Sequence, residues 1–162
     1  MGRLTDEMKR VVDEQRLGFV ATVCPDGTPN LSPKGTTAVW DDEHLVFADI
    51  RSPITVKNLR QNPAVEINVV DPISRKGFRF KGMATVINSG PLFDEVLEFF
   101  KRERGLVQMQ VQTFVLVEVK QARPLISPAY DLGASEEEVS DQWTAYFAAL
   151  RHGTRPAETV SD

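Results

Sequence analysis

The chain has 162 residues, about the length of one ordinary domain, and 41% of them are hydrophobic while 26% are charged. Such a composition is typical of a globular protein that buries a sizeable core. The net charge of −4 argues against a dedicated binder of nucleic acids or of anionic membranes. The single cysteine, Cys24, excludes an intrachain disulfide and a cysteine-based zinc site, and with only two distant histidines no metal site is expected.

No apolar run approaches the roughly 18 residues that a membrane-spanning helix needs. Residues 1–15 are charged throughout and lack the apolar stretch of a signal peptide. One free thiol fits a reducing compartment. A cytoplasmic protein that does not contact a membrane is therefore expected.

The first predicted elements, taken in chain order, are one helix and three strands. Thr5 caps a helix over residues 5–15, whose apolar side chains follow helical spacing. Runs of β-forming residues predict three strands joined as a meander by short turns, over residues 19–23, 29–40 and 44–48. The second strand is expected to break near Pro33 and Gly35.

Three further helices and three further strands follow. The helices are expected to start at Ser52-Pro53, Ser89-Gly90-Pro91 and Ser135, and the strands to cover 64–70, 78–87 and 113–119. Because most strands are joined by hairpins and not by helical crossovers, the pattern predicts a mostly β (α+β) fold, an antiparallel barrel with helices at its rim. The barrel domain is expected over residues 1–125, followed by a C-terminal helical extension and loose tail over 126–162.

The usual catalytic motifs are missing from the chain. It has no phosphate-binding loop ending in Gly-Lys-Ser, no Gly-x-Gly-x-x-Gly, no Gly-x-Ser-x-Gly elbow and no His-Glu-x-x-His pair. Metal ligation and hydrolysis by a Ser-His-Asp triad are therefore not expected, and no catalytic side chain is assigned. A fold that does chemistry without such residues often borrows a cofactor.

The first candidate site is the predicted helix start at Ser52-Pro53. A helix N-terminus offers unpaired N–H groups and a partial positive charge. Cationic and polar side chains gather around it, namely Arg51, Ser52, Thr55, Lys57 and Asn58. This chemistry suits a phosphate monoester, and the alternative is an ordinary N-cap on a solvated helix.

The second candidate site is the interrupted part of the predicted strand over 29–40. Proline and glycine inside a strand mark a bulge or a close approach of the backbone to something else. The segment comprises Ser32, Pro33, Lys34, Gly35, Thr36 and Thr37. Exposed amides at such a kink suit the polar edge of a flat heterocycle, and the alternative is a bulge that only bends a barrel strand.

The third candidate is the run from Arg75 to Gly82. Strand alternation places Phe78 and Phe80 on one face and Arg79 and Lys81 on the other. The two aromatic residues are predicted to be core, and the two cations to form a rim or ligand-facing pair.

Seven segments in order are similar to those of the FMN-binding split-barrel proteins, the pyridoxamine 5′-phosphate oxidase-like family. They are Gly18–Val23, Asp26–Pro29, Ser32–Gly35, Phe47–Asp49, Arg51–Pro53, Asn58–Pro63 and Phe78–Gly82. The resemblance covers about residues 5–120. It implies a six-stranded antiparallel split β-barrel and a homodimer with two FMN sites at the subunit interface.

The same resemblance implies roles for individual residues. Along the isoalloxazine ring it places Ser32, Pro33, Lys34, Gly35, Thr36 and Thr37, and at the end of the third strand Phe47, Ala48 and Asp49. Around the FMN phosphate it places Arg51, Ser52, Thr55, Lys57 and Asn58. Whether Arg79 and Lys81 also reach the cofactor is left open.

The chain departs from true pyridoxamine phosphate oxidases in two places. Their Trp- and Arg-rich C-terminal segment is replaced by Leu125–Asp131 and an acidic helix, and Thr37 stands where they place a lysine near the substrate. The vitamin substrate is therefore not expected. The resemblance implies an FMN-dependent oxidoreductase that transfers hydride through flavin N5 and acts on an unidentified small-molecule substrate or electron donor. A deazaflavin-dependent reductase, a non-enzymatic FMN-binding or electron-transfer protein, and a structural dimer without ligand are the alternatives.

Overall fold

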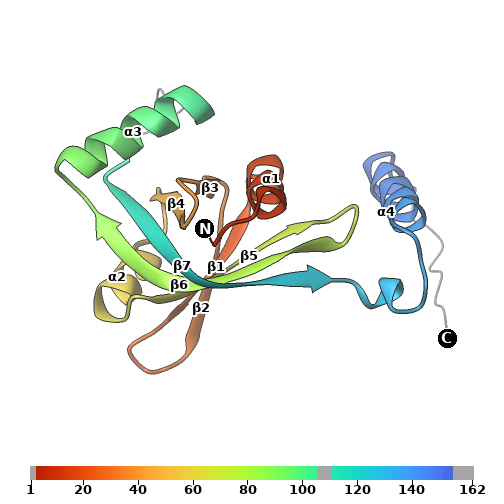
Figure 1. The fold of residues 1–162 in the computed structure, drawn as a ribbon, viewed down its shortest axis with the longest axis horizontal. Coiled ribbons are helices and arrows are strands. Elements are labelled where there is room, and N and C mark those ends of the chain that lie inside the picture. Colours follow the sequence, from red (N-terminus) through yellow and green to blue (C-terminus); the bar gives the residue numbers. More distant parts are fainter. Residues whose placement is uncertain (1–2, 106–110, 155–162) are drawn as a thin grey trace.

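The computed structural model describes residues 3–105 and 111–154. Within these residues one seven-stranded antiparallel sheet curls into a half-barrel, with α1, α2 and α3 beside it and α4 at the end of an extended arm (Figure 1). The strands are β1 (Gly18–Val23), β2 (Pro29–Lys34), β3 (Ala38–Val39), β4 (His44–Asp49), β5 (Ala64–Asp71), β6 (Lys76–Ile87) and β7 (Thr113–Ile126). The helices are α1 (Asp6–Gln15), α2 (Pro53–Gln61), α3 (Pro91–Arg104) and α4 (Glu136–Arg151), and a 3₁₀ turn, η1 (Pro128–Tyr130), precedes α4. The predicted mostly β split barrel is confirmed, with a two-residue seventh strand added to the six that were expected.

The strand order explains where the barrel is split. It runs β2-β1-β5-β6-β7-β4-β3. Both neighbour pairings of the predicted meander occur, β1 with β2 and β3 with β4, but its central strand is broken at the split, and β4 pairs on its other side with β7. The predicted strand over 29–40 breaks after Lys34, and the three residues Gly35–Thr37, which we call the link, carry the chain from edge strand β2 to edge strand β3. Because four Cα steps span at most about 14 Å, the two edges of the sheet lie close together at the link.

Two cores hold the sheet in its curled form. The larger one fills the inside of the barrel and includes Val20, Phe47 and Phe80. The smaller one lies under α3, where Phe100 stacks on Phe114 with ring centroids 5.4 Å apart. Burial alternates along β1 and β6, as strands with one face on a core require.

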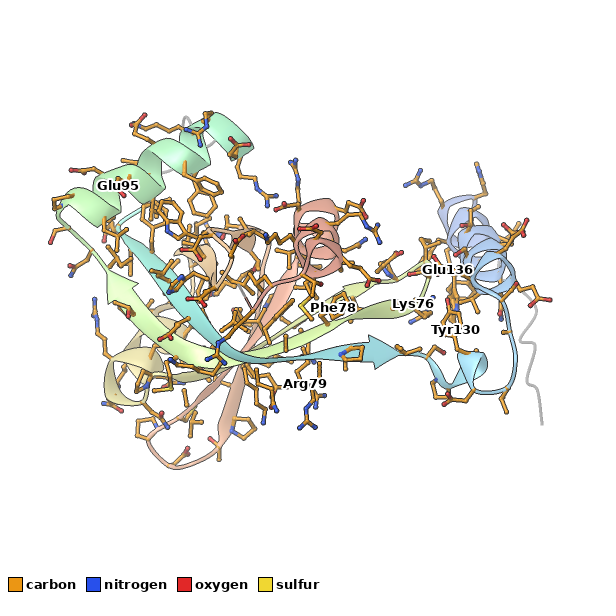
Figure 2. All side chains as sticks on the ribbon, viewed as in Figure 1. Lys76, Phe78, Arg79, Glu95, Tyr130 and Glu136 are labelled. Atoms are coloured by element: carbon orange, nitrogen blue, oxygen red, sulfur yellow. The ribbon has the colours of Figure 1, made fainter. Side chains whose placement is uncertain are left out.

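The outer face of β6 carries the cations that strand alternation placed there. Phe78 and Phe80 are buried in the core, which confirms that prediction. Arg79 and Lys81 face outward and form ion pairs with Glu66 of β5, at 3.0 and 3.5 Å. Figure 2 shows Arg79 on the side of the sheet opposite α1.

The strands β5, β6 and β7 continue past the barrel as an arm that carries η1 and α4 (Figure 1). β7 is longer than its predicted extent of 113–119 because its second half pairs with the start of β6, with Lys76 opposite Ile126. Pro124 is tolerated there because β4 pairs only with the first half of β7, which leaves an open edge.

The helix α4 is attached to the tip of this arm by polar contacts. Lys76 Nζ lies 2.5 Å from Glu136, and the Tyr130 hydroxyl donates to the Ser74 carbonyl at 2.6 Å (Figure 2). The Arg75 guanidinium carbon lies 3.4 Å from the ring centre of Trp143. The capping box expected at the start of this helix is present. The division of the chain into a barrel domain and a C-terminal extension stays a prediction.

Candidate functional site

A stripe of polar side chains follows the inner face of edge strand β2. Asn30, Ser32 and Lys34 lie opposite the inward-facing residues of β1, because β1 and β2 are in antiparallel register with Ser32 opposite Val20. In most strands of this sheet that face holds apolar core. At the split the inner face of the barrel is therefore polar, which is the local feature that a polar ligand requires.

Lys34 is the buried cation of this stripe. Its side chain is only 5% exposed, and its Nζ donates a hydrogen bond to Ser32 Oγ at 3.0 Å. In the part of the chain that the structure describes, the nearest carboxylate oxygen, on Asp49, is 3.9 Å away. Burial lowers the pKa of the Lys34 ammonium, and the charge of Asp49 partly opposes that shift. Positive charge is thus held in a protected place without a close ion pair.

A chain of short contacts joins this cation to the start of α2. Ser32 Oγ lies 3.1 Å from Ser52 Oγ, and the Ser52 N–H donates to Asp49 Oδ1 at 3.0 Å. The contacts bring together β2, the end of β4 and the N-terminus of α2, three elements that are adjacent to the split. The structure thereby places the two predicted candidate sites next to each other.

The link is fixed at both ends but leaves its first residue open. Thr36 Oγ1 accepts from the Ala48 N–H at 2.9 Å, and Thr37 Oγ1 donates to the Lys34 carbonyl at 2.9 Å. Gly35 is exposed, and a Cβ built on it would meet nothing closer than the Arg16 carbonyl at 3.9 Å. The backbone of Gly35 is therefore accessible to a flat ligand.

The start of α2 has the features of an anion site on its exposed side. Pro53 occupies the first helical turn, and Ser52 stands at the N-cap position without a side-chain cap bond, since its hydroxyl contacts Ser32. Arg51 and Lys57 are exposed. These charges and the helix dipole favour an anion at this end of the helix.

Two of the residues predicted to bind the phosphate make hydrogen bonds within the protein instead. The Asn58 amide donates to Thr22 Oγ1 at 3.1 Å and contacts Cys24 Sγ at 3.4 Å. Thr55 accepts from the Asn30 amide at 3.4 Å. Thr55 and Asn58 thus hold α2 against β1 and β2, and their side chains act on a ligand only through the position of the helix.

The residues predicted at the end of the third strand are also mainly internal. Phe47 belongs to the larger core and Ala48 to the smaller one, and the Ala48 N–H and carbonyl both bond to Thr36 Oγ1, so neither side chain is available to a cofactor. Asp49 is the exception, because its carboxylate contacts Ser52 and lies near Lys34. Pro33 is exposed on the outer face of β2.

Sequence reasoning missed three residues that shape this region. Thr22 and Asn30 were visible as polar residues at inward positions of their strands, so alternation was the signal that could have found them. Arg104 of α3 donates from Nη2 to the Thr37 carbonyl at 3.2 Å. No sequence signal pointed to that contact, since 67 positions separate the two residues.

A hollow of about 350 Å³ lies on the outer side of β1, β5 and β6, and none of the predicted cofactor residues lines it. Among residues 3–105 and 111–154, no group of three or more potential metal ligands occurs. In the same part of the chain no helix combines the length and the apolar character that crossing a membrane requires.

Comparison with known proteins gives one curated relative and several solved structures. An uncharacterised protein, MJ0282, of Methanocaldococcus jannaschii is 30% identical over 90 residues, which is 54% of this chain and 59% of that protein. The chain thus spans less than two thirds of that relative's length. The crystal structure of HupZ from Group A Streptococcus is 29% identical, with a TM-score of 0.68, over 76% of this chain and 95% of that one.

Two more distant structures share the fold. An F420 reductase is 23% identical with a TM-score of 0.59, over 74% of this chain and 98% of that one. An FMN-binding protein from Syntrophomonas wolfei is 14% identical with a TM-score of 0.61, over 73% of this chain and 84% of that one. At these identities the likeness establishes the architecture only.

The family model for pyridoxamine 5′-phosphate oxidase matches residues 4–123. That range holds the whole barrel sheet except the last residues of β7. The match covers well over half of the chain and agrees with the resemblance and with the split barrel. The chain therefore belongs to the pyridoxamine 5′-phosphate oxidase family.

Proposed function

We propose that this protein binds FMN and is an FMN-dependent oxidoreductase, with a small-molecule substrate or electron donor that is not identified. The observation that carries the proposal is the buried Lys34 ammonium, which lies between the accessible link and the start of α2. FMN, when bound, supplies hydride transfer through N5 of its ring. The residues of the chain supply binding, orientation and charge.

The phosphate end of the cofactor fits the exposed side of the α2 N-terminus. Arg51 and Lys57 are the cations available there, and Ser52 supplies a hydroxyl. Charge-assisted hydrogen bonds to a phosphate dianion are the strong kind, because both partners contribute charge. Thr55 and Asn58 keep the helix in place through their bonds to β1 and β2.

The ring end fits the link. Gly35 offers a backbone without a side chain, and Ile50 and Ile54 are large apolar residues left exposed next to the α2 N-terminus. A flat, mostly apolar ring system gains from covering such surface. Lys34 is placed to stabilise negative charge at the polar edge of the ring, as a fixed cation in a protected site does.

A symmetric homodimer is part of the proposal. The outer faces of β1 and β2 expose Phe19, Val23 and Leu31, and the register places Leu31 opposite Ala21, between Phe19 and Val23 on the same face. Members of this family are often dimers, and exposed apolar patches of this kind mark interaction sites. The cofactor would then lie at the border between two copies of the chain.

The absorption spectrum of the purified protein tests the cofactor. Bands near ~450 nm after reconstitution indicate a bound flavin, by general flavin chemistry. Tight binding of a deazaflavin in place of FMN would support a deazaflavin-dependent reductase instead. Absence of binding to either compound would overturn the proposal and favour a structural dimer.

Stopped-flow mixing of the FMN-loaded protein with nicotinamide donors tests the enzymatic part. Reduction of the bound flavin by a donor supports an oxidoreductase that takes hydride. If no organic donor reduces the flavin, while small electron-transfer proteins do, the non-enzymatic electron-transfer alternative holds.

A further inference from the structure

Arg104 reaches from the last turn of α3 to the link. Its Nη2 donates to the Thr37 carbonyl at 3.2 Å, and its side chain is only 9% exposed. The contact joins the C-terminal end of α3 to the three residues that cross the split. Arg104 and Arg16 also line a hollow of about 240 Å³ with Val39 and Phe99 of the surrounding elements.

The other hydrogen bonds of the link go to Lys34 at the end of β2 and to Ala48 of β4. Thr37 donates its hydroxyl and its N–H to the Lys34 carbonyl, at 2.9 and 3.2 Å, and Thr36 bonds to the Ala48 backbone. Within the described residues, Arg104 supplies the one side-chain bond to the link that comes from a helix. It therefore sets where the link stands relative to α3.

Another nitrogen of the Arg104 guanidinium lacks a hydrogen-bond partner in the described residues. Nη1 is buried and has no hydrogen-bond partner in residues 3–105 or 111–154, and the nearest Asp13 oxygen is 3.9 Å from Nη2. Burial and the charge of Arg16 lower the pKa of the Arg104 guanidinium. A buried cation with one hydrogen bond is a net cost to folding, and its replacement by an apolar side chain is often neutral or stabilising.

We infer that Arg104 is a positioning residue of the candidate site, which fixes the Gly35–Thr37 link through its bond to the Thr37 carbonyl and so holds the surface on which the flavin ring lies. That this surface holds a flavin ring rests on the proposed function, whereas the fixing of the link by Arg104 does not. Arg104 acts through Thr37 and touches neither the phosphate end nor the substrate. Its removal should loosen the ring surface without weakening the fold.

The test replaces Arg104 and a matched neighbour. Arg104→Met removes the guanidinium and keeps an apolar side chain of similar length, and Arg104→Lys keeps a cation with a donor. Arg102→Met is the control, because Arg102 lies in the same turn, its side chain is 70% exposed, and the ion pair it forms within residues 3–105 and 111–154 is with Glu103. Thermal unfolding and amide hydrogen exchange of the protein without cofactor are measured first.

In Arg104→Met we expect the amide exchange of the link to rise about tenfold or more, while the unfolding temperature stays unchanged or rises. The affinities for FMN and for riboflavin should fall by the same factor, about tenfold, because the ring surface and not the phosphate site has changed; this corresponds to losing one charge-assisted hydrogen bond. Arg104→Lys should recover part of both losses, and Arg102→Met should change neither.

Unchanged link exchange in Arg104→Met would overturn the inference. So would a fall in the unfolding temperature that accompanies equal exchange increases throughout the barrel, since that pattern marks a general structural role. If the unaltered protein binds no flavin, the proposed function fails on its own, and the exchange measurement still decides whether Arg104 fixes the link.

Discussion

Lys34 is the single residue on which the chemistry of the candidate site depends most. Its ammonium is buried, bonded to Ser32 and 3.9 Å from the nearest carboxylate oxygen, on Asp49. A cation held in this way stabilises electron-rich states of a group beside it and destabilises its own protonated form. These two effects are measurable separately.

The first prediction concerns the reduction potential of bound FMN. Lys34→Met removes one positive charge near the ring, so the potential should fall. A charge at partly buried range contributes about 1–2 kcal/mol, which for a two-electron couple is roughly 20–45 mV. A dye-coupled redox titration of both FMN-loaded proteins measures it, with Lys57→Ala as the control that should leave the potential unchanged. An unchanged or raised potential in Lys34→Met would place this lysine away from the ring.

The second prediction concerns pH and stability without cofactor. Burial lowers the pKa of Lys34 below its usual 10.5, so near the ordinary pKa the unfolded chain binds more protons than the folded one. Stability therefore rises with pH between the lowered pKa and 10.5, and below that window the burial penalty is fully present. The stability difference between Lys34→Met and the unaltered protein should shift in favour of the unaltered protein as pH rises through this window. Urea unfolding at a series of pH values measures it, and a shift in the opposite direction would show that Asp49 dominates.

The third prediction separates the phosphate end from the ring end. Lys57→Ala should weaken FMN about 10- to 150-fold, the value of one charge-assisted contact of 1.5–3 kcal/mol, and should leave riboflavin nearly unaffected. Arg60→Ala is the control, since Arg60 is an exposed cation at the other end of the same helix. Isothermal titration with both ligands gives the comparison. Equal losses for FMN and riboflavin would mean that Lys57 acts through the fold and not through the phosphate.

At the scale of elements, local signals predicted which residues form helices and strands and which neighbouring strands form hairpins, but not which distant strands pair. The Thr5 cap, the Pro53 start of α2 and the alternation of β6 are local, and each element was found where it was expected. The pairing of β4 with β7 joins residues that are about 70 positions apart, such as His44 and Glu118. A local pattern indicates the nearest hairpins, which are present as β1 with β2 and β3 with β4, but it carries no signal for the pairing of β4 with β7.

In the candidate site, too, features with a local sequence signal were predicted, whereas those that depend on contacts between distant residues were not. Strand interruption and helix-start chemistry pointed to the link and to the start of α2 from nearby residues alone. The inward burial of Thr55 and Asn58 was not predictable, because it depends on Thr22 and Asn30 of two other strands. Capping chemistry shows that a helix begins at a residue but does not show which of its faces is covered.

The fourth prediction concerns the link as an element. Gly35→Val should abolish FMN binding and leave the fold intact, because a Cβ added at Gly35 has only the Arg16 carbonyl oxygen within 4 Å, at 3.9 Å, and the side chain would occupy the space proposed for the ring. Gly82→Ala is the contrasting change, since its Cβ would lie 2.2 Å from the Glu118 carbonyl oxygen in the middle of the sheet. The unfolding temperature should therefore fall in Gly82→Ala and stay unchanged in Gly35→Val. Retained FMN affinity in Gly35→Val would remove the link from the cofactor site.

At the scale of the whole molecule, the described residues leave apolar side chains exposed in several places. They include the patch of Phe19, Val23 and Leu31 on the outer side of β1 and β2, and Phe147 and Leu150 of α4 on the arm. A single small barrel cannot cover these side chains by itself. Oligomer formation through a two-fold axis uses one patch twice, once from each copy.

The fifth prediction is that the protein is a homodimer held by the patch on β1 and β2. Light scattering at micromolar concentration should give twice the chain mass of 18.1 kDa. Leu31→Lys should dissociate the dimer, because Leu31 is 65% exposed at the centre of the patch and a two-fold interface would bury the new charge twice. Leu132→Lys is the matched control: Leu132 is 89% exposed but lies beyond the barrel, near the start of α4, so the same change should leave the mass unchanged. A mass of one chain for the unaltered protein would exclude the dimer, whereas dissociation by Leu132→Lys alone would move the interface from the barrel to the C-terminal extension.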